Sequence, residues 1–331
     1  MSQIAKATLA AAFGFGACGA ALAQPGAALA SSYPIKPIRV ISQYASGAAG
    51  DVLTRIVTSQ MQDSLGQPLI VDNRPGAGGV VAAESVARAA PDGYTLLVAG
   101  PGTQVVRVFL VKNSSFDPVK DFTPITAMAD SPVVIVAHPS VPAANFRELI
   151  DYARANPGKI SYGTSGVGSH HHLGGEQIDL LTGSRMVHVP YKAGAQALVD
   201  LVAGQLQTSY SVLGPALNMV KAGKARAMVV MTDKRIAQLP DVPAITELIP
   251  AFSPLRSWVG LFGPANLPEP ILRRVNSDAV KSISSAEGRA KVIAAGYIAM
   301  GGTPEQFTSL IAQDLIYVGR IVKAANIQPT E

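Results

Sequence analysis

The sequence predicts an α/β fold of two domains, each a mostly parallel sheet flanked by helices. Short β-branched runs alternate with amphipathic stretches along the chain, a pattern typical of parallel strands covered by helices. About eleven strands are expected, which is more than one open sheet usually carries before it divides. The chain has 331 residues, of which 48% are apolar, so two domains can each bury a core.

The first strand, loop and helix show this pattern most clearly. Residues 37–43 form a β-branched run, residues 44–50 a loop of small residues, and residues 51–65 carry apolar residues at helical spacing. The unit then repeats. Further strands are expected at 69–72, 95–99, 132–137, 160–163, 186–189, 206–212 and 225–231. Loops are expected at 73–79 and 100–104. Helices are expected from 80 to 89, at 145–155, after 169, and at 195–202, 269–282, 286–295 and 304–325.

Two places are expected to carry the chain between the domains. At residues 130–132 an extended run meets a proline, and residues 251–256 form a proline-flanked segment before the apolar run 258–262. We therefore expect domain 2 to span residues 132–252, and domain 1 to be discontinuous, with residues 33–131 plus 253–331. Two such crossings make a hinge with a cleft, and closure is expected to bend the chain near Ser131 and Pro254.

The N-terminus has the features of an export signal. Lys6 precedes an Ala/Gly/Leu/Phe stretch, and Ala21-Leu22-Ala23 matches a small-residue cleavage site, so we expect residues 1–23 to be removed near Ala23. The stretch is short and rich in Ala and Gly for a membrane anchor. Cys18, the sole cysteine, lies within this segment in a poor match to a lipoprotein box, so the mature chain is expected to have no disulfide.

Charge excludes one large class of partner. The net charge is +5, with no run of like charges and no basic residues interleaved with aromatic ones, so no nucleic-acid binding is expected. A mild positive charge attracts small anions at most.

Two loops of small residues are the strongest candidates for a binding site. Between Tyr44 and Asp51 nothing is larger than Ser, and residues 164–169 combine glycines with three hydroxyls. Each loop is expected to lead from the carboxyl end of a strand into a helix N-terminus, where backbone N–H groups and the helix dipole favour an anion. A pair of such loops suits a ligand with two polar ends, such as a dicarboxylate. The alternative is that small residues only permit tight turns and close packing.

The expected ligand-binding residues follow from these loops. Tyr44 and Tyr191 are candidate walls, since a phenol offers an apolar face and one hydrogen bond. Asp51 is by default an N-cap, and a carboxylate there would repel an anion, so we assign it a role in ordering the loop. His172 is the best of three histidines for donating to a ligand, although an exposed or capping histidine is equally expected. The full set is Tyr44, Ser46, Gly47, Ala48, Asp51, Thr103, Thr164, Ser165, Gly168, Ser169, His172 and Tyr191.

No metal, cofactor or catalytic residue is expected. Three consecutive histidines on a helix point about 100° apart and cannot chelate one ion, and no HExxH motif is present. The glycine-rich residues 74–79 fit neither GxGxxG nor GxxxxGK[ST] and are read as a turn and helix start. Residues 163–167 fall short of a GxSxG elbow because Val167 replaces the second glycine.

Seven motifs in order carry a family resemblance. From residue 33 to about 327 the chain resembles the Bug-type (Bordetella uptake gene), TctC-like receptors of tripartite tricarboxylate transporters. The resemblance implies a periplasmic two-domain protein of the class II Venus flytrap type, without catalytic activity. Such a protein holds a small organic acid between its domains, partly through waters, and delivers it to a transporter in the cytoplasmic membrane. The motifs are YPxxPIR (33–39), VDNRPGAGG (71–79), PDGYTLL (91–97), FDPVKDF (116–122), GSxxHL (168–173), HVPYK (188–192) and LPDVP (239–243).

The chain departs from the family pattern in the first loop. Ala45-Ser46-Gly47-Ala48 replaces the usual proline and second glycine, and the methyl group of Ala48 narrows the socket and restricts φ. Gln207 and Ser211 stand where acidic residues are common. The expected ligand is thus a small organic carboxylate whose class stays open: a di- or tricarboxylate, an amino acid, or a larger aromatic acid.

Two other functions stay open on the sequence. One is a secreted α/β hydrolase that uses Ser165 or Ser169 with a histidine. The other is a receptor of the same kind that docks to a sensor kinase instead of a transporter. In either receptor role the chain is expected to be a monomer.

Overall fold

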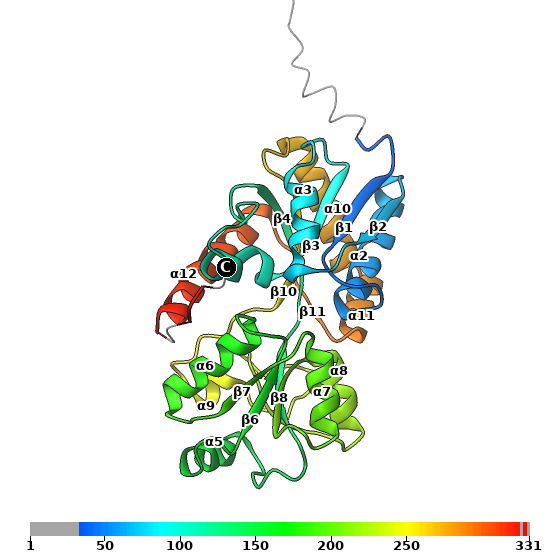
Figure 1. The fold of residues 1–331 in the computed structure, drawn as a ribbon. Helices are drawn as coiled ribbons and strands as arrows, with labels where there is room; N and C mark the ends of the chain where they lie inside the picture. The colour runs from blue at the N-terminus through cyan, green and yellow to red at the C-terminus, as the bar shows by residue number, and fades with distance from the viewer. Residues whose placement is uncertain (1–32, 325–326, 330–331) are drawn as a thin grey trace, which may run out of the picture. The chain divides into compact units, whose positions relative to one another are not determined.

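The computed structural model describes residues 33–324 and 327–329 and contains two sheets (Figure 1). The predicted export signal at residues 1–23, its cleavage site near Ala23, and Cys18 lie outside the described residues. Residues 34–331 belong to one compact unit that contains both sheets. We call the part built on the six-stranded sheet the first lobe and the part built on the five-stranded sheet the second lobe.

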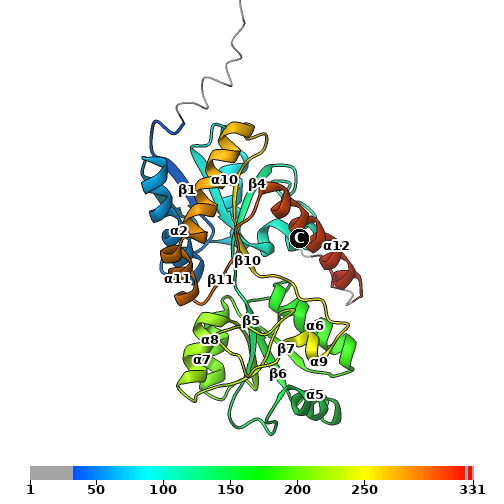
Figure 2. The same ribbon diagram turned by 180° about the vertical axis from the view of Figure 1, so that it is seen from behind.

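The first lobe has helices on both faces of its sheet. The strand order is β11-β4-β10-β3-β1-β2. The helices α3, α4 and α12 share one apolar core on one face, and α2, α10 and α11 pack together on the other; Figures 1 and 2 show α12 on the opposite side from α2. The elements are β1 (Ile38–Ser42), α2 (Ala49–Leu65), β2 (Leu69–Asn73), η1 (Ala77–Gly79), α3 (Val80–Ala87), β3 (Thr95–Ala99), η2 (Gly102–Val106), α4 (Arg107–Leu110), β4 (Phe122–Asp130), β10 (Trp258–Pro264), α10 (Glu269–Ser284), α11 (Ala286–Ala294), β11 (Ile298–Ala299) and α12 (Pro304–Ala324).

The second lobe repeats this plan on a smaller sheet of order β7-β6-β8-β5-β9. One core lies under α5, α6 and α9, and a separate core lies under α7 and α8 on the other face. The elements are β5 (Val133–Ala137), α5 (Phe146–Ala155), β6 (Ser161–Thr164), α6 (His170–Thr182), β7 (Val187–Pro190), α7 (Gly194–Val202), β8 (Thr208–Val212), α8 (Leu213–Lys221), β9 (Arg226–Val230) and α9 (Ile245–Leu248).

The α/β class with two helix-flanked sheets is confirmed. Both sheets are mixed, although most strands of each run in the same direction. In the second lobe β5 runs antiparallel to both neighbours, β8 and β9, whereas β6 is parallel to β7 and β8. In the first lobe β10 runs antiparallel to β3 and β4. These reversed strands are the first strand after each passage between the lobes, so each enters its sheet from the opposite end.

The two passages between the lobes lie side by side. The chain leaves β4 through Ser131 and returns to β10 through residues 249–257. The N–H of Ser131 donates to the carbonyl of Ser257 at 3.0 Å, and the N–H of Ser257 donates to the Asp130 carboxylate at 3.0 Å. The passages are therefore joined to each other as well as to the two sheets.

Several elements differ from the sequence prediction. Residues 100–104 were expected to be a loop, but Pro101 opens a π-helical turn, η2, that continues into α4. Proline is well suited to this place because it lacks the N–H that a first turn leaves unpaired. The strands β4 and β11 and the short helices α4, α8 and α9 were not predicted.

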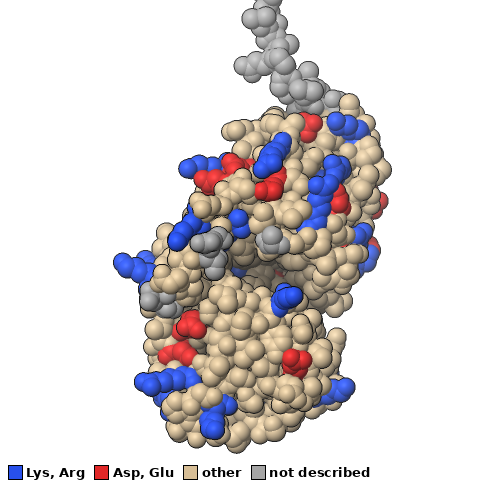
Figure 3. Space-filling model, in the orientation of Figure 1, with Lys and Arg blue, Asp and Glu red and all other residues tan. Residues whose placement is uncertain are grey.

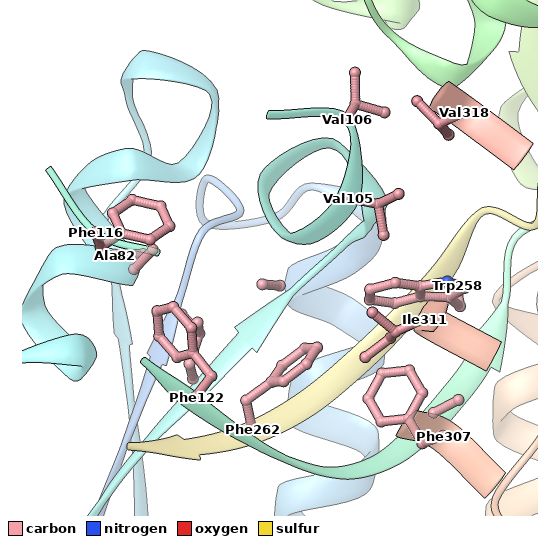
Figure 4. Close-up of a cluster of buried hydrophobic side chains, with 14 of the residues drawn as sticks. Ala82, Val105, Val106, Phe116, Phe122, Trp258, Phe262, Phe307, Ile311 and Val318 are labelled. Atoms are coloured by element: carbon pink, nitrogen blue, oxygen red, sulfur yellow. The ribbon is translucent and has the colours of Figure 1, made fainter. Parts of the chain in front are cut away.

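Trp258 is central to the core of the first lobe. Its side chain is fully buried against Phe307, with the rings edge to face at 5.0 Å between centroids, and against Phe262 (Figure 4). The indole Nε1–H donates to the Asp314 carboxylate at 2.8 Å. Burial of a side chain of this size contributes about 2–3 kcal/mol to the free energy of unfolding, so Trp258 ties β10 firmly to α12.

Candidate functional site

A cavity of about 680 Å³ is lined by residues of both lobes. The first lobe contributes the start of α2 and the η2–α4 segment, the second contributes the loop before α6 and the starts of α7 and α8, and Ser131, Ser257 and Trp258 line it at the passages. Figure 3 shows a hollow between the lobes on one face. At one edge of the cavity Leu110 lies against Gly168, so the lobes touch there.

The cavity brings together part of the predicted site. Tyr44, Ala48, Ser165, Gly168 and Ser169 line it. The other predicted residues do not line it; they are Ser46, Gly47, Asp51, Thr103, Thr164, His172 and Tyr191.

Asp51 orders the first loop, as predicted, but it is not the N-cap. It is the third residue of α2 and turns back, so that its carboxylate accepts from the N–H of Gly47 at 2.9 Å and from Nδ2 of Asn73 at 2.7 Å. Asn73 also donates to the carbonyl of Tyr44 at 2.9 Å. Although burial opposes ionisation, the hydrogen bonds from Arg55, Asn73 and Gly47 hold the pKa of Asp51 below its usual value.

The residue before α2, Ala48, cannot cap the helix, and no side chain does so. Ala48, Ala49 and Gly50 line the cavity. The first-turn N–H groups of an uncapped helix need partners from outside the helix. This end of the cavity is therefore suited to an oxygen ligand.

Tyr44 forms a wall of the cavity, with its ring directly over Gly50: a Cβ at Gly50 would lie 2.4 Å from the ring. Burial raises the pKa of the Tyr44 phenol well above its usual value, so the hydroxyl stays protonated. Thr103 lies behind the wall, where its hydroxyl bridges the Gln43 side chain at 2.6 Å and the Gly78 carbonyl at 2.8 Å. Thr103 is thus placed to position Gln43, which does line the cavity.

His172 lies behind the second loop and not in the cavity. Its Nδ1 accepts from the N–H of Gly168 at 3.1 Å, so its proton sits on Nε2, which is 3.4 Å from the Glu176 carboxylate. The ring stacks on His188 with centroids 3.9 Å apart. Burial lowers the pKa of His188 to about 4, and the bond from His172 lowers the pKa of Glu176. His172 therefore shapes the loop that carries Gly168.

Three further predicted residues have internal partners, whereas Ser46 is exposed. Thr164 is fully buried and its hydroxyl bonds to Nε2 of His188 at 2.7 Å. The Tyr191 hydroxyl donates to Asp200 at 2.8 Å, and burial raises its pKa to about 12. Ser169 caps α6 by accepting from the N–H of His172 at 3.2 Å.

His170 and His171 line the cavity, although the sequence favoured His172. Nδ1 of His171 lies 3.1 Å from the Ser165 hydroxyl, and the Nε2 atoms of both His170 and His171 are buried without a hydrogen-bond partner. Burial lowers the pKa of His170 to about 4 and also lowers that of His171 well below its usual value, so both rings are uncharged at neutral pH. The three consecutive histidines at a helix start indicated that one of them could face a ligand. The sequence alone does not show which way each side chain points.

Arg107 is a site residue that the sequence analysis missed. It is the only charged side chain among the described residues that line this cavity. Its Nε donates to Ser114 at 2.9 Å and its guanidinium lies over the Phe116 ring, 5.2 Å from the centroid. Burial lowers its pKa, but an arginine stays protonated at neutral pH. Because residues 100–104 were read as a loop, the helical turn that places Arg107 was not expected.

Among the described residues, Ser165 and His171 do not form a complete hydrolase arrangement. Ser165 and His171 are in contact, but the other ring nitrogen of His171 has no partner, whereas a catalytic histidine needs a third group to orient it. No three His, Cys, Asp or Glu side chains of the described part of the chain are grouped to hold a metal ion. Within residues 33–324 and 327–329, no helix combines the length and apolar character needed to span a bilayer.

Comparisons with known proteins agree with this arrangement. A family model described as "tripartite tricarboxylate transporter family receptor" matches residues 53–327. A UPF0065 protein of Bordetella pertussis is 35% identical over 267 residues, which cover 81% of this chain and 82% of that protein. A solved structure of a periplasmic transporter shares 36% identity with a TM-score of 0.81 over 89% of this chain and 99% of its own. The structure of R. palustris Rpa4515 with adipate shares 29% identity and gives a TM-score of 0.82; the match covers 90% of this chain and 100% of that chain.

Proposed function

The chain belongs to the tripartite tricarboxylate transporter family of receptors, and we propose that it captures a small organic carboxylate in the cavity between α2 and α6. The family consists of periplasmic solute-binding receptors and not of enzymes, so the resemblance found in the sequence is confirmed. A relative of the same fold is known with adipate, a dicarboxylate, which supports an organic acid as ligand.

One observation carries the proposal: the N-terminal turns of two helices, one from each lobe, line the same cavity. Ala49 and Gly50 begin α2, and His170 and His171 begin α6. Each helix N-terminus carries a partial positive charge and N–H groups without an intrahelical acceptor, of which Ser169 caps one in α6 and no side chain caps any in α2; both features favour an anion. A ligand that contacts both turns stabilises the closed arrangement of the lobes, with bending at the passages near Ser131 and Pro254.

The receptor is proposed to act after export, as a monomer, and to deliver its ligand to a membrane transporter. The family description names the transporter class, and residues 1–23 have the composition of an export signal. Deletion of the gene is expected to abolish uptake of the ligand by intact cells. Normal uptake together with loss of a transcriptional response to the ligand would assign the receptor to a sensor kinase instead.

Binding can be tested directly on the exported chain. Dicarboxylates, tricarboxylates, amino acids and aromatic acids are titrated while Trp258 emission and melting temperature are followed, because Trp258 is the sole tryptophan and begins β10 at the passage beside the cavity. An acid at 100 times its Kd should add about 2.7 kcal/mol to the free energy of unfolding. If no acid changes either signal, the proposal is wrong.

A further inference from the structure

The charge of the cavity sets a limit on its ligand. Arg107 is the only charged residue among the described residues that line the cavity, which has no Asp, Glu or Lys in its wall. The helix N-termini supply about half an elementary charge each, and that partial charge serves a hydroxyl or carbonyl oxygen as well as a carboxylate. Among the described residues, Arg107 is therefore the one full positive charge in the cavity wall.

Arg107 is held ready for a carboxylate. Its Nε donates to Ser114, and its guanidinium carbon lies over the Phe116 ring. Burial lowers the pKa of Arg107 and the charge of Glu84 raises it, but Glu84 forms its ion pair with Arg88, and no described carboxylate forms an ion pair with Arg107. Within the described residues no hydrogen bond engages its two terminal NH₂ groups, and a guanidinium matches a carboxylate with two parallel hydrogen bonds. The side chain is half-buried, so such a pair is less screened than one on the surface.

The body of the cavity is apolar and its other polar side chains are uncharged. Val106, Leu110, Val167, Leu198 and Val212 line it together with Trp258. His171 is only 4% exposed, held by Ser165 through Nδ1, and has no partner at Nε2. A second carboxylate placed here would lose its hydration and meet only the partial charge of the α6 N-terminus, which compensates a full negative charge less well than an ion pair does. A hydroxyl would not suffer that loss.

We infer that the ligand is a monocarboxylic acid with an apolar body and an uncharged hydrogen-bonding group at its far end, with its carboxylate on Arg107 and its uncharged group on His171. This inference rests on the proposed function and narrows it, because the receptor then discriminates against diacids. Arg107 and His171 are the specificity-determining residues.

Two series of matched acids test this inference by calorimetry. The aliphatic series is omega-hydroxyhexanoate, hexanoate, adipate and hexanediol; the aromatic series is para-hydroxymethylbenzoate, para-toluate, terephthalate and benzenedimethanol. In the series whose body fits, the hydroxy acid should bind most tightly, the plain acid next, the diacid at least tenfold more weakly than the hydroxy acid, and the diol not measurably.

Single substitutions test the binding of each end of the ligand separately. Arg107→Gln should weaken both monoacids about 10- to 100-fold, the usual effect of losing a charge-assisted hydrogen bond. Arg88→Gln is the matched control: it removes the same charge from an exposed side chain paired only with Glu84, and should leave every affinity unchanged. His171→Phe should leave the plain acid within about threefold while removing the advantage of the hydroxy acid. The melting temperature of each variant shows that it is folded.

The outcomes are distinct. A diacid that binds more tightly than the hydroxy acid, with Arg107→Gln no different from Arg88→Gln, overturns this inference and leaves the receptor function standing. An unchanged ratio of hydroxy acid to plain acid in His171→Phe overturns the assignment of the far end. If no acid of either series binds, the inference is wrong; if no acid of the broader panel binds either, the proposed function fails with it.

Discussion

Gly214 and Gly296 lie in direct contact across the two lobes: a Cβ at Gly296 would lie 2.5 Å from the Cα of Gly214. Gly214 is in the first turn of α8 in the second lobe. Gly296 follows α11 in the first lobe with φ +85°, and its N–H bonds back to the Ile293 carbonyl, so glycine there also ends the helix. The backbones of the two lobes meet here without any side chain between them.

A side chain at this contact should hold the lobes apart. Gly214→Val would place its methyl groups against the carbonyl of Ala295 and the backbone of Gly296, an overpacking worth about 1–3 kcal/mol. Because the strain exists only when the lobes touch, we expect ligand affinity to fall by tenfold or more with little change in melting temperature. Calorimetry and small-angle scattering measure this. Asn218→Ala, an exposed change on the same helix, is the control, and equal affinity in both variants would contradict the prediction.

Asp51→Asn should loosen the first loop. Asparagine cannot keep all three bonds to Gly47, Asn73 and Arg55, so the free energy of unfolding should fall by about 1–3 kcal/mol at pH 7. Because the pKa of Asp51 is lowered by folding, its contribution is present above its usual pKa and is lost as pH falls through the folded value. The difference between wild type and variant should therefore shrink below about pH 4.

Denaturant unfolding across pH measures this difference, with Asp63→Asn, an exposed carboxylate on the same helix, as the control. A difference in the free energy of unfolding between wild type and Asp51→Asn that is as large at pH 3 as at pH 7 would contradict the stabilising role of the hydrogen bonds to Asp51.

Asp314 should make stability depend on pH in the opposite sense. Burial raises the pKa of Asp314 to about 6, so the folded protein holds a proton that the unfolded chain releases. Stability should be greatest below the usual carboxyl pKa and should fall as pH rises to about 6. Trp258 emission should titrate over the same range, since its indole donates to this carboxylate.

Asp314→Asn keeps an acceptor for Trp258 and removes the titration. It should flatten the emission curve and raise stability at pH 8 by about 1–2 kcal/mol. Asp278→Asn is the control, because Asp278 is equally buried but paired with Arg274. An emission titration that persists in Asp314→Asn would assign it to another group.

Gly50→Ala should displace the Tyr44 ring from the cavity wall. The new methyl would lie 2.4 Å from that ring, while the first turn of α2 gains helix propensity of about 1 kcal/mol. We expect weaker ligand binding without loss of stability. A double-mutant cycle with Tyr44→Ala measures the coupling, and strictly additive effects on affinity would show that the ring does not depend on Gly50.

Local pattern predicted most of the elements but not their directions in the sheets. The helices α2, α5 and α7 begin within two residues of where periodicity placed them, because their apolar stripes face a core. The reversal of β5 and β10 depends on where the chain enters each sheet, which is a long-range property that no local pattern carries. Residues 100–104 were misread because a proline between two glycines is typical of a loop as well as of a helix start.

The sequence predicted which loops line the cavity better than it predicted which side chains face it. Small residues before α2 and α6 indicated backbone exposure, and Ala48 and Gly168 do line the cavity. Thr103 and Tyr191 were expected to contact the ligand, but their hydroxyls bond to Gln43 and Asp200. Whether a hydroxyl bonds to the ligand or to the protein depends on residues distant in sequence. For the same reason the sequence did not identify Arg107 as a residue of the cavity.

The hydrogen bond between Ser131 and Ser257 has a consequence for how such proteins diversify. Since the second lobe begins and ends at bonded residues, both junctions of an exchange with a relative would fall at one place in the fold. A chimera made in this way would keep α2 and Arg107 while replacing α6 and its histidines, so the lining that the second lobe contributes would change in one exchange.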